Sequence, residues 1–282
     1  DYDFSVQDDS LSFEDAIKET ERLFKNAVSR QMISDVPLGA FLSGGVDSST
    51  IVALMQRQSV SKVRTFTVGF DEAGFDEAPF ARAVADHLGT QHTEIRVTAE
   101  QTRTVIPDLP QLYDEPFGDS SQIPTYLVSK IAREHVTVAL SGDAGDEIFG
   151  GYNRYFWAPR IWSRIAWLPF PLRSASGAVI KAIPIKVWDR IGAIVGGPGP
   201  GVNGINRIGD KAHKLAARLS KVRNIDDLYR SLVSEWLDPA SLVQSDGKRI
   251  TEPPSLLDDP LPRFGVDDPA AQMMYRDAMT YL

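Results

Sequence analysis

Helical and strand-like spacings of apolar residues alternate along the first half of this 282-residue chain. Ser12 opens a segment that resembles a capping box, and apolar residues then recur with the period of a helix through about residue 32. We expect an entry helix here. Its apolar side chains, among them Phe13, Ile17 and Leu23, are expected to pack in the core.

Four later segments have the composition and spacing of β-strands, and helical patterns separate them. Residues 76–88 are one such helical segment, and Gly89 terminates it. Strands that alternate with helices predict an α/β fold, a parallel sheet flanked by helices on both faces. Ligands of such sheets bind at the carboxyl ends of the strands. The predicted strands are residues 37–42, 62–70, 91–97 and 136–140.

The second half of the chain differs in composition and charge. Residues 1–151 carry 25 acidic and 12 basic side chains, whereas residues 152–282 carry 13 acidic and 18 basic ones. All five tryptophans and mainly helical patterns lie in the second half. We therefore expect residues 1–151 to form the α/β core and residues 152–282 to form a mainly helical second region.

The sequence SGGVDSS at residues 43–49 connects the first predicted strand to a helix. Adjacent glycines and a helix start present backbone N–H groups to an anion such as a phosphate chain. Asp47 would repel bare phosphate, so its place in this loop predicts a Mg²⁺ ion between carboxylate and phosphate. The alternative is that Asp47 only caps the helix. The chain has no G-x-x-x-x-G-K-[ST] motif, so the loop is not a Walker loop.

A second loop, SGDAGDE at residues 141–147, follows the fourth predicted strand. The first loop resembles the PP-loop of the ATP pyrophosphatases, which cleave ATP to AMP and pyrophosphate. Together the two loops resemble the synthetase domain of the glutamine-dependent asparagine synthetases, closely over residues 12–155. This resemblance implies an adenine nucleotide alpha hydrolase-like fold, and ATP and Mg²⁺ as cofactors.

The resemblance also implies roles for individual residues. Asp47 and Asp146 are expected to bind the metal and, with Asp143, to be catalytic. Asp143 stands where many family members carry Glu, and Ala144 replaces a usual Gly. The residues expected to bind ATP or pyrophosphate are Leu42, Ser43, Gly44, Gly45, Asp47, Ser48, Val68, Ser141 and Gly142.

Acidic and hydroxyl side chains are concentrated between the two loops, just before a predicted helix start. Such groups suit a site that holds the ammonium and α-carboxylate of an amino acid. The resemblance implies that this stretch adjoins the acceptor site. The expected acceptor-site residues are Asp114, Glu115, Ser120 and Ser121.

The absence of cysteine excludes disulfides, thiolate metal sites and a cysteine nucleophile. The glutaminase domain of the family begins with a catalytic cysteine, whereas this chain begins at Asp1, so we expect that domain to be missing. The family also continues beyond the equivalent of Leu282 with basic segments, so we expect the chain to be truncated at its C-terminus.

The resemblance implies ATP-dependent amidation of aspartate by ammonia through β-aspartyl-AMP. A β-lactam-synthetase-like ligase acting on another carboxylate and a noncatalytic nucleotide-binding module remain alternatives. The acidic first half would repel nucleic acid. Without an apolar run of 18 residues or a signal-peptide pattern, we expect no membrane partner and a cytoplasmic location. A homodimer is also expected.

Overall fold

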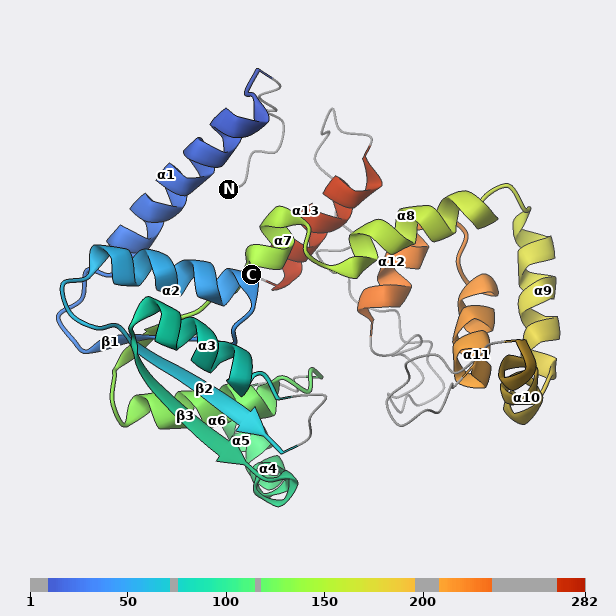
Figure 1. Ribbon diagram of the computed structural model, residues 1–282. Helices are drawn as coiled ribbons and strands as arrows, with labels where there is room; N and C mark the ends of the chain where they lie inside the picture. The colour runs from blue at the N-terminus through green and yellow to red at the C-terminus, as the bar shows by residue number, and fades with distance from the viewer. Residues whose placement is uncertain (1–9, 72–75, 115–117, 196–207, 235–267, 282) are drawn as a thin grey trace. The chain divides into compact units, whose positions relative to one another are not determined.

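The chain forms two compact units, Val6–Gly145 and Asp146–Leu282, in a computed structural model (Figure 1). The chain passes from one unit to the other inside the second acidic loop, whereas composition and charge suggest a boundary at residue 151. The structure describes residues 10–71, 76–114, 118–195, 208–234 and 268–281.

A four-stranded parallel sheet with the strand order β3-β2-β1-β4 forms the centre of the first unit. Ala40 of β1 is paired with Thr65 of β2 on one side and with Leu140 of β4 on the other. Because β1 and β4 are parallel neighbours, the loops that follow them leave the same edge of the sheet. The predicted parallel α/β fold is confirmed. The strands are β1 (Leu38–Phe41), β2 (Arg64–Phe70), β3 (Gln91–Val97) and β4 (Val138–Leu140).

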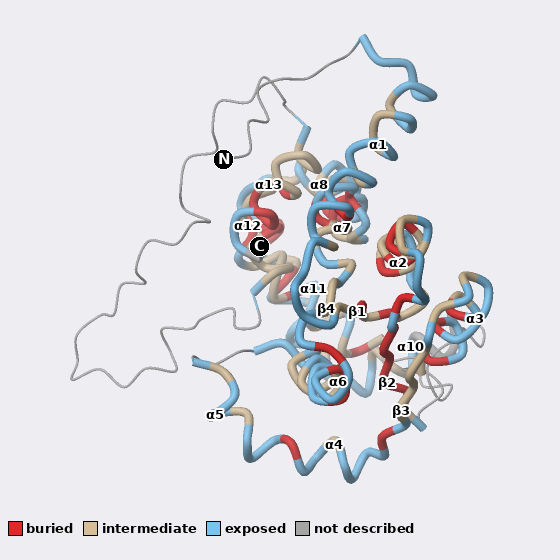
Figure 2. Tube along the Cα trace, turned by 90° about the vertical axis from the view of Figure 1, so that its left-hand side faces the viewer, coloured by how far each residue is buried: buried red, intermediate tan, exposed pale blue. Residues whose placement is uncertain are grey.

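Helices cover both faces of this sheet, with α2 and α3 on one face and α6 on the other (Figure 1). One hydrophobic core joins α1, α2 and α3 to β1, and a second joins α6 to β2 and β3. Figure 2 shows buried residues along β1 and β2 and on α2. The helices are α1 (Phe13–Gln31), α2 (Val46–Gln58), α3 (Ala78–Leu88), α4 (Ala99–Val105), the 3₁₀ helix η1 (Ile106–Asp108), α5 (Leu109–Leu112) and α6 (Gln122–Arg133).

The entry helix α1 begins as predicted but buries less than predicted. The Ser12 side chain caps it by accepting a hydrogen bond from the backbone N–H of Asp15. Figure 1 shows α1 meeting α2 at its C-terminal end and extending away from the sheet at its N-terminal end. The expectation of core packing is therefore wrong for the first turns, where Phe13 is 82% exposed and Ile17 and Leu23 are about half exposed.

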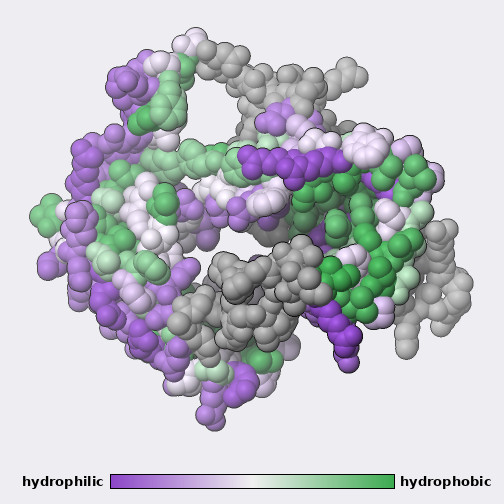
Figure 3. Space-filling model, turned by 45° about the vertical axis from the view of Figure 1, so that its right-hand side comes forward, coloured by the Kyte–Doolittle hydropathy of each residue, from purple (hydrophilic) through white to green (hydrophobic). Residues whose placement is uncertain are grey.

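Every regular element in the described residues of the second unit is a helix, which confirms the predicted mainly helical region. Tyr155 and Tyr229 are fully buried in its core, together with Met273. Large apolar side chains of α9 and α10 remain at the surface, and Figure 3 shows hydrophobic surface in this part of the molecule. The helices are α7 (Gly145–Phe149), α8 (Asn153–Ile165), α9 (Phe170–Ala182), α10 (Ile185–Val195), α11 (Ile208–Leu219), α12 (Ile225–Val233) and α13 (Pro269–Tyr281).

No helix within the described ranges is long and apolar enough to cross a membrane.

Candidate nucleotide-binding site

The first loop is held together by two serine hydroxyls. The backbone N–H of Ser43 donates to Ser48 Oγ at 3.2 Å, and the two serine Oγ atoms lie 2.9 Å apart. Ser48 is buried, and its Oγ also donates to the carbonyl of Gly45 at 3.4 Å. The backbone of the loop is therefore bent by its own side chains before any ligand is bound.

Gly44 occupies a position that only glycine fits. Its φ of 82° lies in the left-handed region, which side-chain-bearing residues rarely adopt. A Cβ atom at this position would also lie 2.6 Å from the carbonyl carbon of Phe80 in α3. The packing of α3 against the loop therefore requires the first glycine of the SGG sequence, and the motif has a steric basis as well as a ligand-binding one.

The second loop meets the first turn of α2. A Cβ atom on Gly142 would lie 2.6 Å from the backbone nitrogen of Ser48, and one on Gly145 would lie 2.5 Å from Asp47 Cγ. Two segments far apart in sequence thus converge, as the carboxyl ends of neighbouring parallel strands do. Sequence reasoning singled out Gly142 but missed Gly145, whose only signal was a small residue directly before Asp146.

Asp47 is the second residue of α2, and its carboxylate is half-buried. The residue that caps this helix is Gly45, which makes no side-chain bond, so the helix-cap alternative for Asp47 is wrong. Within the described part of the chain, no hydrogen bond or ion pair reaches the Asp47 carboxylate. The positive end of the helix dipole stabilises this negative charge. A hard carboxylate oxygen left available in this position fits the donor set that Mg²⁺ prefers.

The segment that follows β4 contains a strained residue. The Ser141 hydroxyl donates to Asp143 Oδ2 at 2.8 Å, and both side chains are exposed. Ala144 has a φ of 76° and, in the described ranges, is the one residue other than glycine with a positive φ. Glycine adopts this conformation without steric cost. The family's usual glycine at this position is therefore explained by the backbone conformation.

Asp146 begins the second unit. The backbone N–H of Gly151 donates to the Asp146 carbonyl at 2.9 Å and closes a turn around α7. Glu147 is buried and accepts a hydrogen bond from the Tyr152 hydroxyl at 2.9 Å. Because Asp47 and Asp146 belong to different compact units, their joint binding of one metal stays a prediction.

The residues predicted to contact adenosine or the acceptor are placed as follows. Leu42 and Val68 are buried members of the two cores of the sheet, and the Leu42 N–H donates to the Phe66 carbonyl. Their roles toward adenosine stay predictions. The predicted helix start near the acceptor residues is confirmed, since α6 begins at Gln122. Asp114, Ser120 and Ser121 are exposed, and Glu115 lies outside the described residues.

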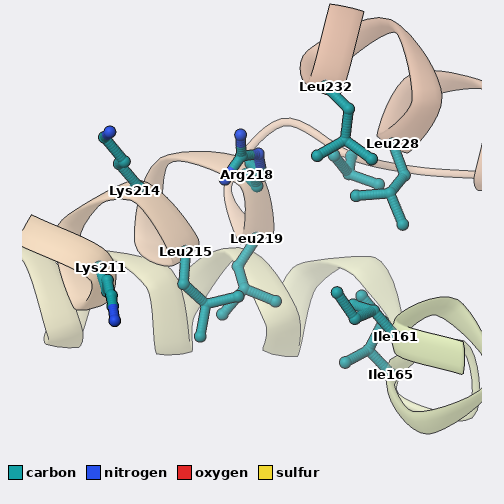
Figure 4. Close-up of a pocket in the computed structure, with 10 residues that line it drawn as sticks. Ile161, Ile165, Lys211, Lys214, Leu215, Arg218, Leu219, Leu228 and Leu232 are labelled. Carbon is teal, nitrogen blue, oxygen red and sulfur yellow. The ribbon is translucent and has the colours of Figure 1, made fainter. Parts of the chain in front are cut away.

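A cavity of about 190 Å³ lies inside the helical unit, away from both loops in sequence. Figure 4 shows leucine and isoleucine side chains of α8, α11 and α12 around it. Its polar lining groups are the cations of Lys211, Lys214 and Arg218. The cavity therefore offers no carboxylate or hydroxyl for a reaction.

Comparison with known proteins identifies the family. The asparagine synthase family model matches residues 19–282. The chain is 50% identical over 137 residues to a putative glutamine-hydrolysing asparagine synthetase 2 of Methanocaldococcus jannaschii. This match covers 48% of the chain and 26% of that protein. It is 42% identical over 139 residues to the glutamine-hydrolysing asparagine synthetase 1 of Bacillus subtilis, with 49% of this chain and 22% of that protein covered.

A third relative, a putative glutamine-hydrolysing asparagine synthetase of Mycobacterium bovis, is 39% identical over 166 residues. That match covers 59% of this chain and 25% of the relative, so the matches span about a quarter of the length of these relatives. The family model covers most of the chain, including both loops. The resemblance inferred from the two loops is confirmed, and the chain belongs to the asparagine synthase family.

Proposed function

We propose that this chain is the ATP-dependent synthetase part of a glutamine-hydrolysing asparagine synthetase. An oxygen of the aspartate side-chain carboxylate attacks the α-phosphorus of ATP, the bond to the bridging oxygen breaks, and pyrophosphate leaves with the electron pair. Ammonia then attacks the carbonyl carbon of β-aspartyl-AMP, the bond from this carbon to the AMP oxygen breaks, and AMP leaves with the electron pair while the nitrogen loses a proton to give the amide of asparagine. The ammonia comes from a glutaminase domain outside this chain, and the enzyme works in the cytoplasm as a homodimer.

The single observation that carries this proposal is the Asp47 carboxylate. It is half-buried without a described partner, at the start of α2 and against Gly145 of the second loop. A half-buried carboxylate without a partner is costly unless a cation compensates it. Asp47 and Asp146 would hold Mg²⁺, which would neutralise the charge that develops on the departing pyrophosphate.

The other residues of the chain position the reactants. Backbone N–H groups in the first turn of α2 donate to the phosphates, because helix-start amides have no partner inside the helix. The Gly45 N–H before this helix already donates to Ser43 Oγ at 3.3 Å. Asp143 is proposed to orient the ammonia or the adenylate. Asp114, Glu115, Ser120 and Ser121 are proposed to hold the ammonium and α-carboxylate of aspartate.

Calorimetric titration with ATP, with and without Mg²⁺, tests this proposal on the chain and on Asp47→Ala. We expect Mg²⁺ to strengthen ATP binding to the wild type, and Asp47→Ala to weaken binding about tenfold or more when Mg²⁺ is present. Asp35→Ala is the matched control, since it removes an exposed carboxylate from the opposite end of β1. Equal affinity of the Asp47→Ala variant and the wild type under both conditions would refute the metal-binding role.

The substrate is tested by exchange of labelled pyrophosphate into ATP. Exchange that requires aspartate is the expected result. Exchange driven by another carboxylate would favour the β-lactam-synthetase-like alternative, and ATP binding without exchange would favour a noncatalytic nucleotide-binding module.

A further inference from the structure

The most completely buried charge in the described residues is the carboxylate of Asp277 on α13, which has no exposed surface. It accepts hydrogen bonds from the hydroxyls of Tyr155 at 2.5 Å and Tyr229 at 2.6 Å. The guanidinium of Arg154 donates a hydrogen bond to the same carboxylate through Nε at 2.9 Å and forms an ion pair with it, in which a terminal nitrogen lies 2.8 Å from Asp277 Oδ2. A buried charge is tolerated only when it is paired and hydrogen-bonded in this way.

The contacts of Asp277 continue toward the second acidic loop. The Arg154 guanidinium that it holds lies over the ring of Tyr152, with 3.8 Å between the guanidinium carbon and the ring centroid. The hydroxyl of Tyr152 in turn donates to the buried carboxylate of Glu147. Burial, and then the hydrogen bond to Glu147, raise the pKa of Tyr152, so its hydroxyl remains a proton donor. The series Asp277, Arg154, Tyr152 and Glu147 therefore connects α13 to the residue beside Asp146.

The turn that contains Asp146 is also tightly packed. A Cβ atom on Gly151 would lie 1.9 Å from Asp146 Oδ1, so the aspartate side chain lies directly against this glycine. A Cβ atom on Gly150 would lie 3.4 Å from the sulfur of Met274, one turn before Asp277 on α13. A second contact from the same helix thus reaches the turn from another direction.

We infer that Asp277 is a positioning residue: it fixes the turn of residues 146–151, and with it Asp146, through Arg154, Tyr152 and Glu147. The catalytic consequence rests on the proposed function, in which Asp146 is a metal ligand. The structural consequence does not, because it concerns only the stability of the turn. The two can therefore be tested separately.

Hydrogen exchange of the turn tests the structural part in the full 282-residue chain. Asp277→Asn should accelerate exchange of the Gly151 amide about tenfold or more, beyond any acceleration caused by lower global stability. The reason is that the turn can open locally more easily once the contacts that hold Glu147 in place are weakened. Tyr152→Phe should do the same, since it removes only the hydroxyl bond to Glu147. If Asp277→Asn does not fold, Tyr152→Phe still tests whether the contact to Glu147 fixes the turn. Tyr229→Phe is the matched control: it removes a hydroxyl bond to the same carboxylate, but on the side of α12, so the turn should exchange as in the wild type.

Unchanged exchange at Gly151 in Tyr152→Phe would overturn the inference, as would equal acceleration in Tyr152→Phe and Tyr229→Phe. The catalytic part is read from aspartate-dependent pyrophosphate exchange. Tyr152→Phe should lower kcat about tenfold with little change in the KM for ATP, and the effect should largely disappear in a Glu147→Ala background, which removes the acceptor of the Tyr152 hydroxyl. If the effects of the Tyr152 and Glu147 substitutions on kcat were fully additive, the proposed coupling through these two residues would be contradicted. Absence of pyrophosphate exchange in the wild type would count against the proposed function alone, since the hydrogen-exchange result stands without it.

Discussion

Replacing Ala144 by glycine is expected to stabilise the first unit. Ala144 has a φ of 76°, and in the left-handed region the Cβ of an L-residue is crowded against the following carbonyl oxygen. A left-handed conformation costs an L-residue about 1–2 kcal/mol. Glycine relieves this strain, but its greater freedom in the unfolded chain offsets about 0.4–1 kcal/mol of the gain. The net stabilisation expected for Ala144→Gly is therefore roughly 0.5–1 kcal/mol.

Gly89 offers the reverse experiment in the same unit. It ends α3 with a φ of 71°, close to that of Ala144, and a Cβ atom there would meet nothing within 4 Å. Gly89→Ala therefore measures the backbone cost of a side chain in this conformation without any clash. We expect it to lower the free energy of unfolding by about the amount that Ala144→Gly raises it.

Urea and thermal unfolding of the two variants and the wild type provide the measurement. For a domain of this size, 1 kcal/mol corresponds to a shift in Tm of roughly 2–4 °C, so the two variants should move in opposite directions by about that amount or less. The slope m should not change, because neither substitution alters the surface exposed on unfolding. An Ala144→Gly variant that is no more stable than the wild type, beside a destabilised Gly89→Ala, would refute the assignment of strain to Ala144.

Two further predictions concern the loop contact and the buried tyrosines. Gly145→Ala should weaken Mg²⁺-dependent ATP binding about tenfold while leaving Tm nearly unchanged, because its Cβ would displace the end of the flexible Asp47 side chain rather than backbone. Burial, and then the hydrogen bond to Asp277, raise the pKa of Tyr155 and Tyr229 above the ordinary value of 10. Their contribution to stability is thus complete below pH 10 and is lost above it, by about 1.4 kcal/mol per pH unit for each tyrosine. Urea unfolding on both sides of pH 10 should show a smaller loss in Tyr229→Phe, and an equal loss would contradict this origin.

The sheet could be predicted from the sequence because its signals are local. The strand at residues 91–97 matches β3 at both ends, and Gly89 ends α3 as predicted. The burial of α1 could not be predicted in the same way. Helical spacing shows that an apolar face exists, but the tertiary contacts decide how much of it is covered, and α2 covers only part.

The site was predictable in its residue types and in the convergence of its two loops. The alternation of strands and helices predicts that both loops lie at the carboxyl ends of parallel strands. Asp47 and Gly142 come into contact because β1 and β4 are also neighbours, and this strand order required the structure. The contacts of Phe80 with Gly44 and of Gly145 with Asp47 were not predictable. Each depends on how closely two segments pack in the folded chain, and local sequence patterns do not determine that distance. Ala144 is an intermediate case: the departure from the family pattern was visible, but its physical meaning required the φ angle.

The serines of the first loop limit what residue types alone can say about phosphate binding. Ser48 is predicted to bind phosphate, yet its hydroxyl already contacts Ser43 and the carbonyl of Gly45 inside the loop. A direct bond from Ser48 Oγ to phosphate would require one of these contacts to be given up. Backbone N–H groups at the start of α2 need no such exchange, because they lack partners within the helix. The anion-binding capacity of the loop therefore depends mainly on its backbone conformation, and the serines and Gly44 contribute by fixing that conformation.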